Sequence, residues 1–252
     1  MATKPKAGTA VAVVKKTSTS VVSIQEQLRA QAAAMAERTA PPSGSKITIT
    51  QDKKFKLPDG STTAGPLQLV IVDFVARNKF YEGAYDKDNI APPACFAIGQ
   101  NPLKLVPSGN SPVKQSSDCG SCPMNQFGSD GKGKACKNGR VLAVLPPDAD
   151  ADTPLWTLEV SPTALKSFDG FVQGVARTFQ MPPVSVICSV SFNPAVTYAS
   201  LQFGEPKANG NMAVHFARQA EAAEMLAVEP DVSTYAAPAP VKKAAARPMA
   251  RR

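Results

Sequence analysis

Short runs that alternate apolar and polar residues fill the middle of the chain, a pattern typical of half-buried β-strands. Segment 46–51 (KITITQ) alternates isoleucine with polar residues, and segment 65–83 is a β-branched and aromatic run long enough for one bent or bulged strand. Segments 140–145 (RVLAVL) and 154–160 (PLWTLEV) flank an acidic loop, as the arms of a hairpin do. This part of the chain predicts a small barrel or a strongly curled sheet.

The pattern then changes to a helical period. In segment 161–179, large apolar residues recur every three or four positions, which predicts an amphipathic helix. Segments 184–192 and 198–205 predict two more strands, and segment 212–226 predicts a last helix. This order of elements is that of an oligonucleotide-binding (OB) barrel. We therefore expect a mainly β fold with helices (α+β), an OB-like, partly open five-stranded barrel, although a generic α+β domain gives a similar order.

Both ends of the chain differ in composition from the middle. Residues 1–45 form a basic tail, in which the capping-box sequence Ser23–Glu26 predicts the start of a short Ala-rich helix. Residues 227–252 are a Pro/Ala/basic stretch with little to bury, which predicts a disordered tail. Residues 46–226 are the expected core, and they include an insertion at 95–140 that carries four cysteines.

The net charge of +8 and the pI of about 9.3 arise in three separate regions. Residues 1–45 hold six Lys or Arg against two Glu, and residues 95–140 hold six against two Asp. Residues 240–252 hold five basic residues and no acid, so the rest of the chain is net acidic. This segregation predicts a polyanionic partner.

The sequence also bears on the cellular compartment. It contains no run of 18 apolar residues, and residues 1–20 hold only a five-residue apolar stretch. We therefore expect neither a membrane span nor a secretory signal, and a cytoplasmic location. In a reducing compartment, closely spaced cysteines are more often metal ligands than disulfides.

Four of the five cysteines, Cys95, Cys119, Cys122 and Cys136, have spacing suited to a metal site. A Cys-x2-Cys turn lets two thiolates reach one ion, and the other two cysteines would complete a tetrahedral set. The Gly- and Lys-rich loop between them has little to pack, so a bound metal would supply folding free energy that the loop lacks. The cysteines therefore predict a structural zinc ion.

Other interpretations of the cysteines stay open. Four thiolates also hold iron–sulfur clusters, and spacing does not distinguish the two; zinc is preferred because no redox or radical machinery is visible. A Cys-x2-Cys pair can be a redox motif, although this one does not open a helix after a strand. Cys95 could instead end a buried strand, and Cys188 is expected to be a small core residue.

The sequence carries none of the common catalytic motifs. His215 is the only histidine, it lies in no HxE or HExxH pattern, and it is expected to be a surface or helix-packing residue. Segment 128–134 is rich in Gly and Lys but lacks the GxxxxGK[ST] form of a P-loop. No nucleophile elbow or paired-carboxylate motif is visible, so we expect a protein that is not an enzyme.

Residues 76–87 interleave basic and aromatic side chains, as single-strand-binding surfaces do. Strand alternation directs at least one of Phe80 and Tyr81 toward the core. Phe127 is a second stacking candidate, which could instead cap the metal site. The expected nucleic-acid-binding residues are Arg77, Lys79, Phe80, Tyr81, Tyr85, Lys87, Phe127, Lys132, Lys134, Lys137 and Arg140.

The block CGSCPMNQFGSDGKGKACKNGRVLAVL, followed by LEVSPTALKSF, VQGVARTFQMPPVSV and YASLQF, resembles bacteriophage single-stranded DNA-binding proteins. The resemblance covers about residues 46–206. It implies an OB barrel with a cysteine-liganded zinc insertion, and non-sequence-specific coating of single strands during replication and recombination. The chain departs from the family in ending with ARPMARR, where many members have an acidic, partner-recruiting tail.

Two other functions compete with single-stranded DNA binding. The chain could be a zinc-stapled structural or interaction protein of a virion or transcription complex, in which the basic tails alone touch nucleic acid. It could also be an iron–sulfur protein, which visible absorbance would reveal. The sequence leaves open whether the nucleic acid is DNA or RNA, and which oligomer forms.

Overall fold

The residues described by this computed structural model are Ile24, Gln27, Leu28, Gln31, 45–83 and 90–236. The four isolated N-terminal residues are helical. The rest of the expected Ala-rich helix and N-terminal tail, the basic residues after 236, and the expected contacts Tyr85 and Lys87 lie outside the described residues. The chain divides into two compact units, and the unit from Gly44 onward carries the fold.

The expected strands and helices occur in the expected order, with a mainly β composition, but the described part of the chain holds nine strands where a five-stranded barrel was expected. The strands are β1 (Lys46–Ile49), β2 (Phe55–Lys56), β3 (Thr62–Thr63), β4 (Leu67–Phe80), β5 (Cys95–Gly99), β6 (Lys137–Leu145), β7 (Trp156–Val160), β8 (Val186–Phe192) and β9 (Leu201–Ala208). The α-helices are α2 (Leu165–Phe179), α3 (Met212–Ala217) and α4 (Gln219–Ala227). Short 3-10 turns are η1 (Pro123–Asn125), η2 (Pro162–Ala164) and η3 (Pro183–Ser185). Within the described ranges, no helix is both long and apolar enough to cross a membrane.

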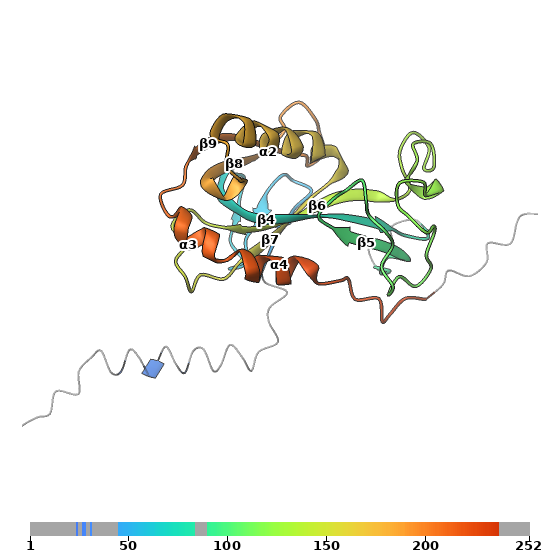
Figure 1. Ribbon diagram of the computed structural model, residues 1–252, viewed down its shortest axis with the longest axis horizontal. Coiled ribbons are helices and arrows are strands. Elements are labelled where there is room, and N and C mark those ends of the chain that lie inside the picture. The colour runs from blue at the N-terminus through green and yellow to red at the C-terminus, as the bar shows by residue number, and fades with distance from the viewer. Residues whose placement is uncertain (1–23, 25–26, 29–30, 32–44, 84–89, 237–252) are drawn as a thin grey trace, which may run out of the picture. The chain divides into compact units, whose positions relative to one another are not determined.

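All nine strands belong to one sheet in the order β3-β2-β1-β7-β6-β4-β8-β9, with β5 added to β4. The 14-residue β4 organises this sheet, because it pairs antiparallel with β8 near its start and with β5 near its end, and with β6 along most of its length. The sheet curls strongly into an open half-barrel around β4 (Figure 1). The expected hairpin is confirmed as β6 and β7, which pair antiparallel.

Two apolar cores lie on opposite faces of the sheet, one under α2 and the other under α4 (Figure 1). β4 contributes to both cores because alternate side chains of a strand point to opposite faces. Leu69 and Ile71 pack in the α2 core, whereas Val72 packs in the α4 core. A bulge between Ile71 and Asp73 shifts the alternation by one residue, as the expected bent strand requires. The bulge therefore decides which side chains near the end of β4 share a face.

The last helix differs from the expectation. Segment 212–226 is not one helix but two, α3 and α4, with a break at Arg218. The backbone of Arg218 leaves helical geometry (φ −88°, ψ 5°), and its guanidinium donates hydrogen bonds to the carbonyl oxygens of Ala151 and Thr153. The break thus ties the helices to the loop between β6 and β7.

The C-terminal boundary of the packed region also lies beyond the expected residue 226. Segment 227–236 runs along the core, where the carboxylate of Glu229 accepts hydrogen bonds from Ser108 (2.5 Å) and Asn110 (2.6 Å). Further on, the Tyr235 hydroxyl donates to Glu82 at 2.6 Å. The packed chain therefore continues to the residues next to the end of β4.

Candidate nucleic-acid groove and four-cysteine cavity

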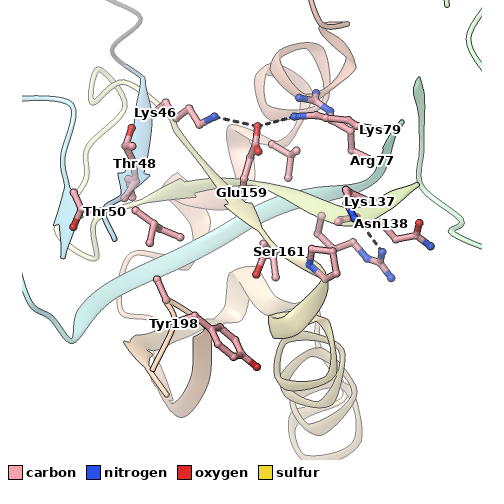
Figure 2. Close-up of a pocket in the computed structure, with 18 of the residues that line it drawn as sticks. Lys46, Thr48, Thr50, Arg77, Lys79, Lys137, Asn138, Glu159, Ser161 and Tyr198 are labelled. Atoms are coloured by element: carbon pink, nitrogen blue, oxygen red, sulfur yellow. Dashed lines mark hydrogen bonds and ion pairs between the residues drawn. The ribbon is translucent and has the colours of Figure 1, made fainter. Parts of the chain in front are cut away.

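A groove of about 620 Å³ opens where β1 separates from β7 (Figure 2). The two strands pair in parallel at Lys46 and Ile47 only, and the following residues of β1 form one wall of the groove. The end of β4, the start of β6, the end of β7 and the loop before β9 complete it. The groove contains five of the residues expected to bind nucleic acid, namely Arg77, Lys79, Tyr81, Lys137 and Arg140.

The end of β4 separates two sites through its alternation. Arg77, Lys79 and Tyr81 line the groove, whereas Asn78 and Phe80 line a second, small cavity that holds the four cysteines. This assigns the pair of adjacent aromatics: Tyr81 belongs to the groove and Phe80 to the cysteine cavity. Strand β4 therefore forms part of the wall of both the groove and the cysteine cavity.

Glu159 is the one acidic residue among the described groove-lining residues. Its carboxylate Oε1 lies 3.1 Å from Lys46 Nζ and 3.2 Å from Lys79 Nζ, so one acid pairs with two lysines (Figure 2). Burial alone would raise the pKa of Glu159, but the two lysines outweigh it and hold the pKa below its usual range. The carboxylate thus stays charged at neutral pH and lies between two lysine ammonium groups.

Replacing Glu159 by glutamine is expected to tighten oligonucleotide binding by about 3- to 10-fold at low salt, because the change removes a charge that repels phosphate and frees Lys46 and Lys79. For the wild type, the same tightening should appear as the pH falls through the lowered pKa of Glu159. Oligo-dT titration of both proteins at pH 7, and of the wild type at pH values below 4.5, where the lowered pKa of Glu159 lies, measures the two effects. An E159Q variant that binds more weakly would show that the ion pairs are needed to shape the groove.

The remaining basic side chains of the groove differ in how many hydrogen bonds or ion pairs they already form within the protein. Arg77 donates to the backbone carbonyls of Leu226 (3.3 Å) and Val228 (3.0 Å), and burial lowers its pKa. Arg140 is buried and pairs with Asp169 at 3.4 Å. These two guanidinium groups fix the walls of the groove and contribute its positive field. Lys137, like Lys46 and Lys79, is more accessible.

Two partly exposed tyrosines lie in the groove among these cations. Tyr81, at the end of β4, is 40% exposed, and Tyr198, in the loop between β8 and β9, is 53% exposed. Burial, followed by the charge of Glu159, raises the pKa of Tyr81, so its hydroxyl stays neutral. Tyr198 and Lys46 were absent from the expected set. Neither stands in a basic–aromatic run, and only the folded chain brings them to the groove.

Phe127 lies outside the groove, on the loop that follows η1, and is 82% exposed. Lys134 Nζ lies 5.0 Å from the centre of its ring, which is a cation–π distance. Lys132 is exposed on the same loop, and Lys137 joins the loop to the groove by pairing with Asp130 at 2.8 Å. Of the expected contacts that the structure describes, five lie in the groove, Phe127, Lys132 and Lys134 lie on this loop, and Phe80 lines the cysteine cavity.

The expected metal ligands Cys95, Cys119, Cys122 and Cys136 are buried, free of disulfides, and line one small cavity. Cys95 is the first residue of β5 and also lines the cavity. Burial raises the pKa of Cys119 to about 11 and that of Cys136 to about 12, with further increases from the neighbouring cysteines. The four thiols are thus close enough to influence one another.

Hydrogen bonds organise the loop around this cavity. The Cys119 amide donates to Leu105 O at 3.0 Å, and the Cys136 amide donates to Met124 O at 2.8 Å. The buried Asn125 side chain donates to Cys119 O at 2.6 Å. In the ranges 45–83 and 90–236, no three His, Cys, Asp or Glu residues have the geometry of a formed metal site. Four thiols around one cavity nevertheless match the soft donor set that zinc prefers, so zinc stays a prediction.

Two residues of chemical interest lie elsewhere. His215 is fully buried on α3, where its Nδ1 lies 3.0 Å from Asn209 Nδ2, and Cys188 is fully buried in the α2 core. Both residues belong to the packing of the fold.

Comparison of the chain with protein-family models, curated proteins and solved structures finds no match.

Proposed function

We propose that this protein binds single-stranded DNA, without sequence specificity, along the groove between β1 and β7. The observation that carries the proposal is the joint presence of basic side chains and two partly exposed tyrosines, Tyr81 and Tyr198, in one groove. Lysine and arginine attract phosphates, and a tyrosine ring can stack on any base. Such a lining suits a nucleic-acid strand whose bases are unpaired.

Single strands fit this groove better than a duplex. Duplex readers place a helix or a two-stranded ribbon in the major groove. Here the helices α2 and α4 pack their apolar faces on the sheet. The tyrosines lie inside a concave groove, and a duplex would present to them only the edges of its base pairs, because the faces of the bases are stacked on one another. RNA offers the same phosphates and unpaired bases, so it is the competing ligand in the experiment below.

The proposal includes a finer view of the architecture. We interpret the curled half-barrel as an OB-like barrel, with residues 95–140 as a lobe held by zinc on four cysteines. On β4, Asn78 and Phe80 line the cysteine cavity of this lobe, whereas Arg77, Lys79 and Tyr81 line the groove. A metal ion would thereby stabilise one wall of the groove. Cytoplasmic coating of single strands in phage replication or recombination, as the family resemblance implies, completes the proposal.

Fluorescence titration of the full chain with labelled oligo-dT, at several salt concentrations, tests the proposal. We expect binding that weakens with salt, with log K against log [salt] falling by about 0.7 for each phosphate neutralised. A duplex of equal length should bind at least tenfold more weakly, and oligo-U serves as the RNA arm. Absence of binding at low salt, or equal affinity for the duplex, would contradict the proposal.

A further inference from the structure

Lys53 holds the loop that carries Tyr198. The turn from Thr50 to Lys54 joins β1 to β2, and in it Lys53 adopts a left-handed backbone conformation (φ 56°). Its ammonium group donates hydrogen bonds to the carbonyl oxygens of Asn193 (3.4 Å) and Val196 (2.5 Å). Both acceptors belong to the loop between β8 and β9. A lysine from one side of the groove thus fixes a loop on the other side.

A second contact joins the same two segments at their base. The rings of Phe55, the first residue of β2, and Phe192, the last residue of β8, stack with centroids 4.4 Å apart. The loop itself is closed by the Asn193 amide, which donates to Ser200 O at 2.8 Å. The turn and the loop are therefore connected by the Phe55–Phe192 stack and by the hydrogen bonds of Lys53. Tyr198 projects from this connected unit.

Tyr198 faces the groove from the side opposite the Lys46–Glu159–Lys79 group (Figure 2). Lys53 itself does not line the groove, because its charge is directed at the loop carbonyls. Resting on the proposed single-strand binding, we propose that Tyr198 is a second base-stacking residue and that Lys53 is the residue that positions it. The bound nucleic acid then contacts Tyr81 on β4 and Tyr198 on the opposite wall of the groove, and a different base stacks on each tyrosine.

A double-mutant cycle on Lys53 and Tyr198 tests this inference. Tyr198→Ala is expected to weaken oligo-dT binding by roughly 5- to 100-fold, the loss of one stacked base, whereas Tyr198→Phe should retain the wild-type affinity. Lys53→Met should weaken binding severalfold and leave the salt slope unchanged, because no phosphate contact is lost. The double variant should bind no more weakly than Tyr198→Ala, since both changes remove the same stacking contact.

Lys54→Met is the matched control. Lys54 is the exposed neighbour of Lys53 and pairs with Asp52 at 2.6 Å, so its replacement removes the same charge without touching the loop. It should leave the affinity within about twofold. Melting curves of all variants verify that they are folded.

Three outcomes would overturn the inference. Unchanged affinity of Tyr198→Ala, while Tyr81→Ala weakens binding, would remove Tyr198 from the interface and leave the proposed function standing. A salt slope reduced by about 0.7 in Lys53→Met, with losses additive to those of Tyr198→Ala, would make Lys53 a phosphate contact instead. Failure of the wild-type chain to bind any single strand would refute the proposed function itself.

Discussion

Replacing Cys119 and Cys122 together by serine is expected to abolish the predicted zinc binding and unfold the lobe of residues 95–140. Structural zinc contributes about 10–16 kcal/mol of apparent binding free energy in small zinc domains, and few apolar residues in this lobe could replace it. The variant should contain no zinc, against about one ion per wild-type chain, and should melt at a lower temperature. Oligo-dT binding should fall more than tenfold, because β4 joins the cysteine cavity to the groove. Elemental analysis, thermal melting and titration measure the three effects.

Cys188→Ala is the control for that experiment. Cys188 is buried in the α2 core and does not line the cysteine cavity, so its replacement should retain the metal with only a modest loss of stability. A metal-free wild-type protein that melts identically with and without chelator would contradict the zinc prediction. Visible absorbance together with bound iron would support the iron–sulfur alternative.

Tyr81→Ala is expected to weaken single-strand binding by about 5- to 100-fold, because one stacked base loses its partner. The metal content should not change, since Tyr81 faces the groove. Tyr81→Phe keeps the ring and should keep the affinity. Titration with oligo-dT at constant salt, alongside zinc analysis, gives both readouts.

The adjacent residue provides a contrasting variant. Phe80 lines the cysteine cavity, so Phe80→Ala should lower the melting temperature and make the metal easier to extract with a chelator. Any effect on DNA should follow from loss of the lobe and disappear when excess zinc restores it. If Phe80→Ala reduced binding directly while Tyr81→Ala did not, the assignment of the two faces of β4 would be reversed.

Hydrophobic periodicity predicted much of the sheet and its main helix, because those elements bury one face and leave the pattern in the sequence. The bulged β4, the β6–β7 hairpin and the amphipathic α2 all have this origin. The alternation of a strand also predicted that Phe80 and Tyr81 point to opposite faces of the sheet. It did not predict which of the two faces the groove, because the bulge between Ile71 and Asp73 shifts the alternation by one residue.

Features produced by tertiary contact were not predictable from local sequence. The parallel pairing of β1 with β7 joins residues more than one hundred positions apart and creates the groove. Tyr198 lies in a loop with no basic neighbour, and the loop is held by Lys53 and by the Phe55–Phe192 stack, which are distant in sequence. The break at Arg218 depends on carbonyl groups of a distant loop.

Photo-crosslinking with an oligonucleotide that carries 5-iodouracil tests the central claim most directly, because this base reacts with the aromatic side chain on which it stacks. Mass spectrometry of the crosslinked full chain should identify Tyr81 and Tyr198, with yields that fall as salt rises. Crosslinks confined to residues outside the groove, such as the exposed Phe127 or Phe216, would contradict the claim that the strand lies between β1 and β7.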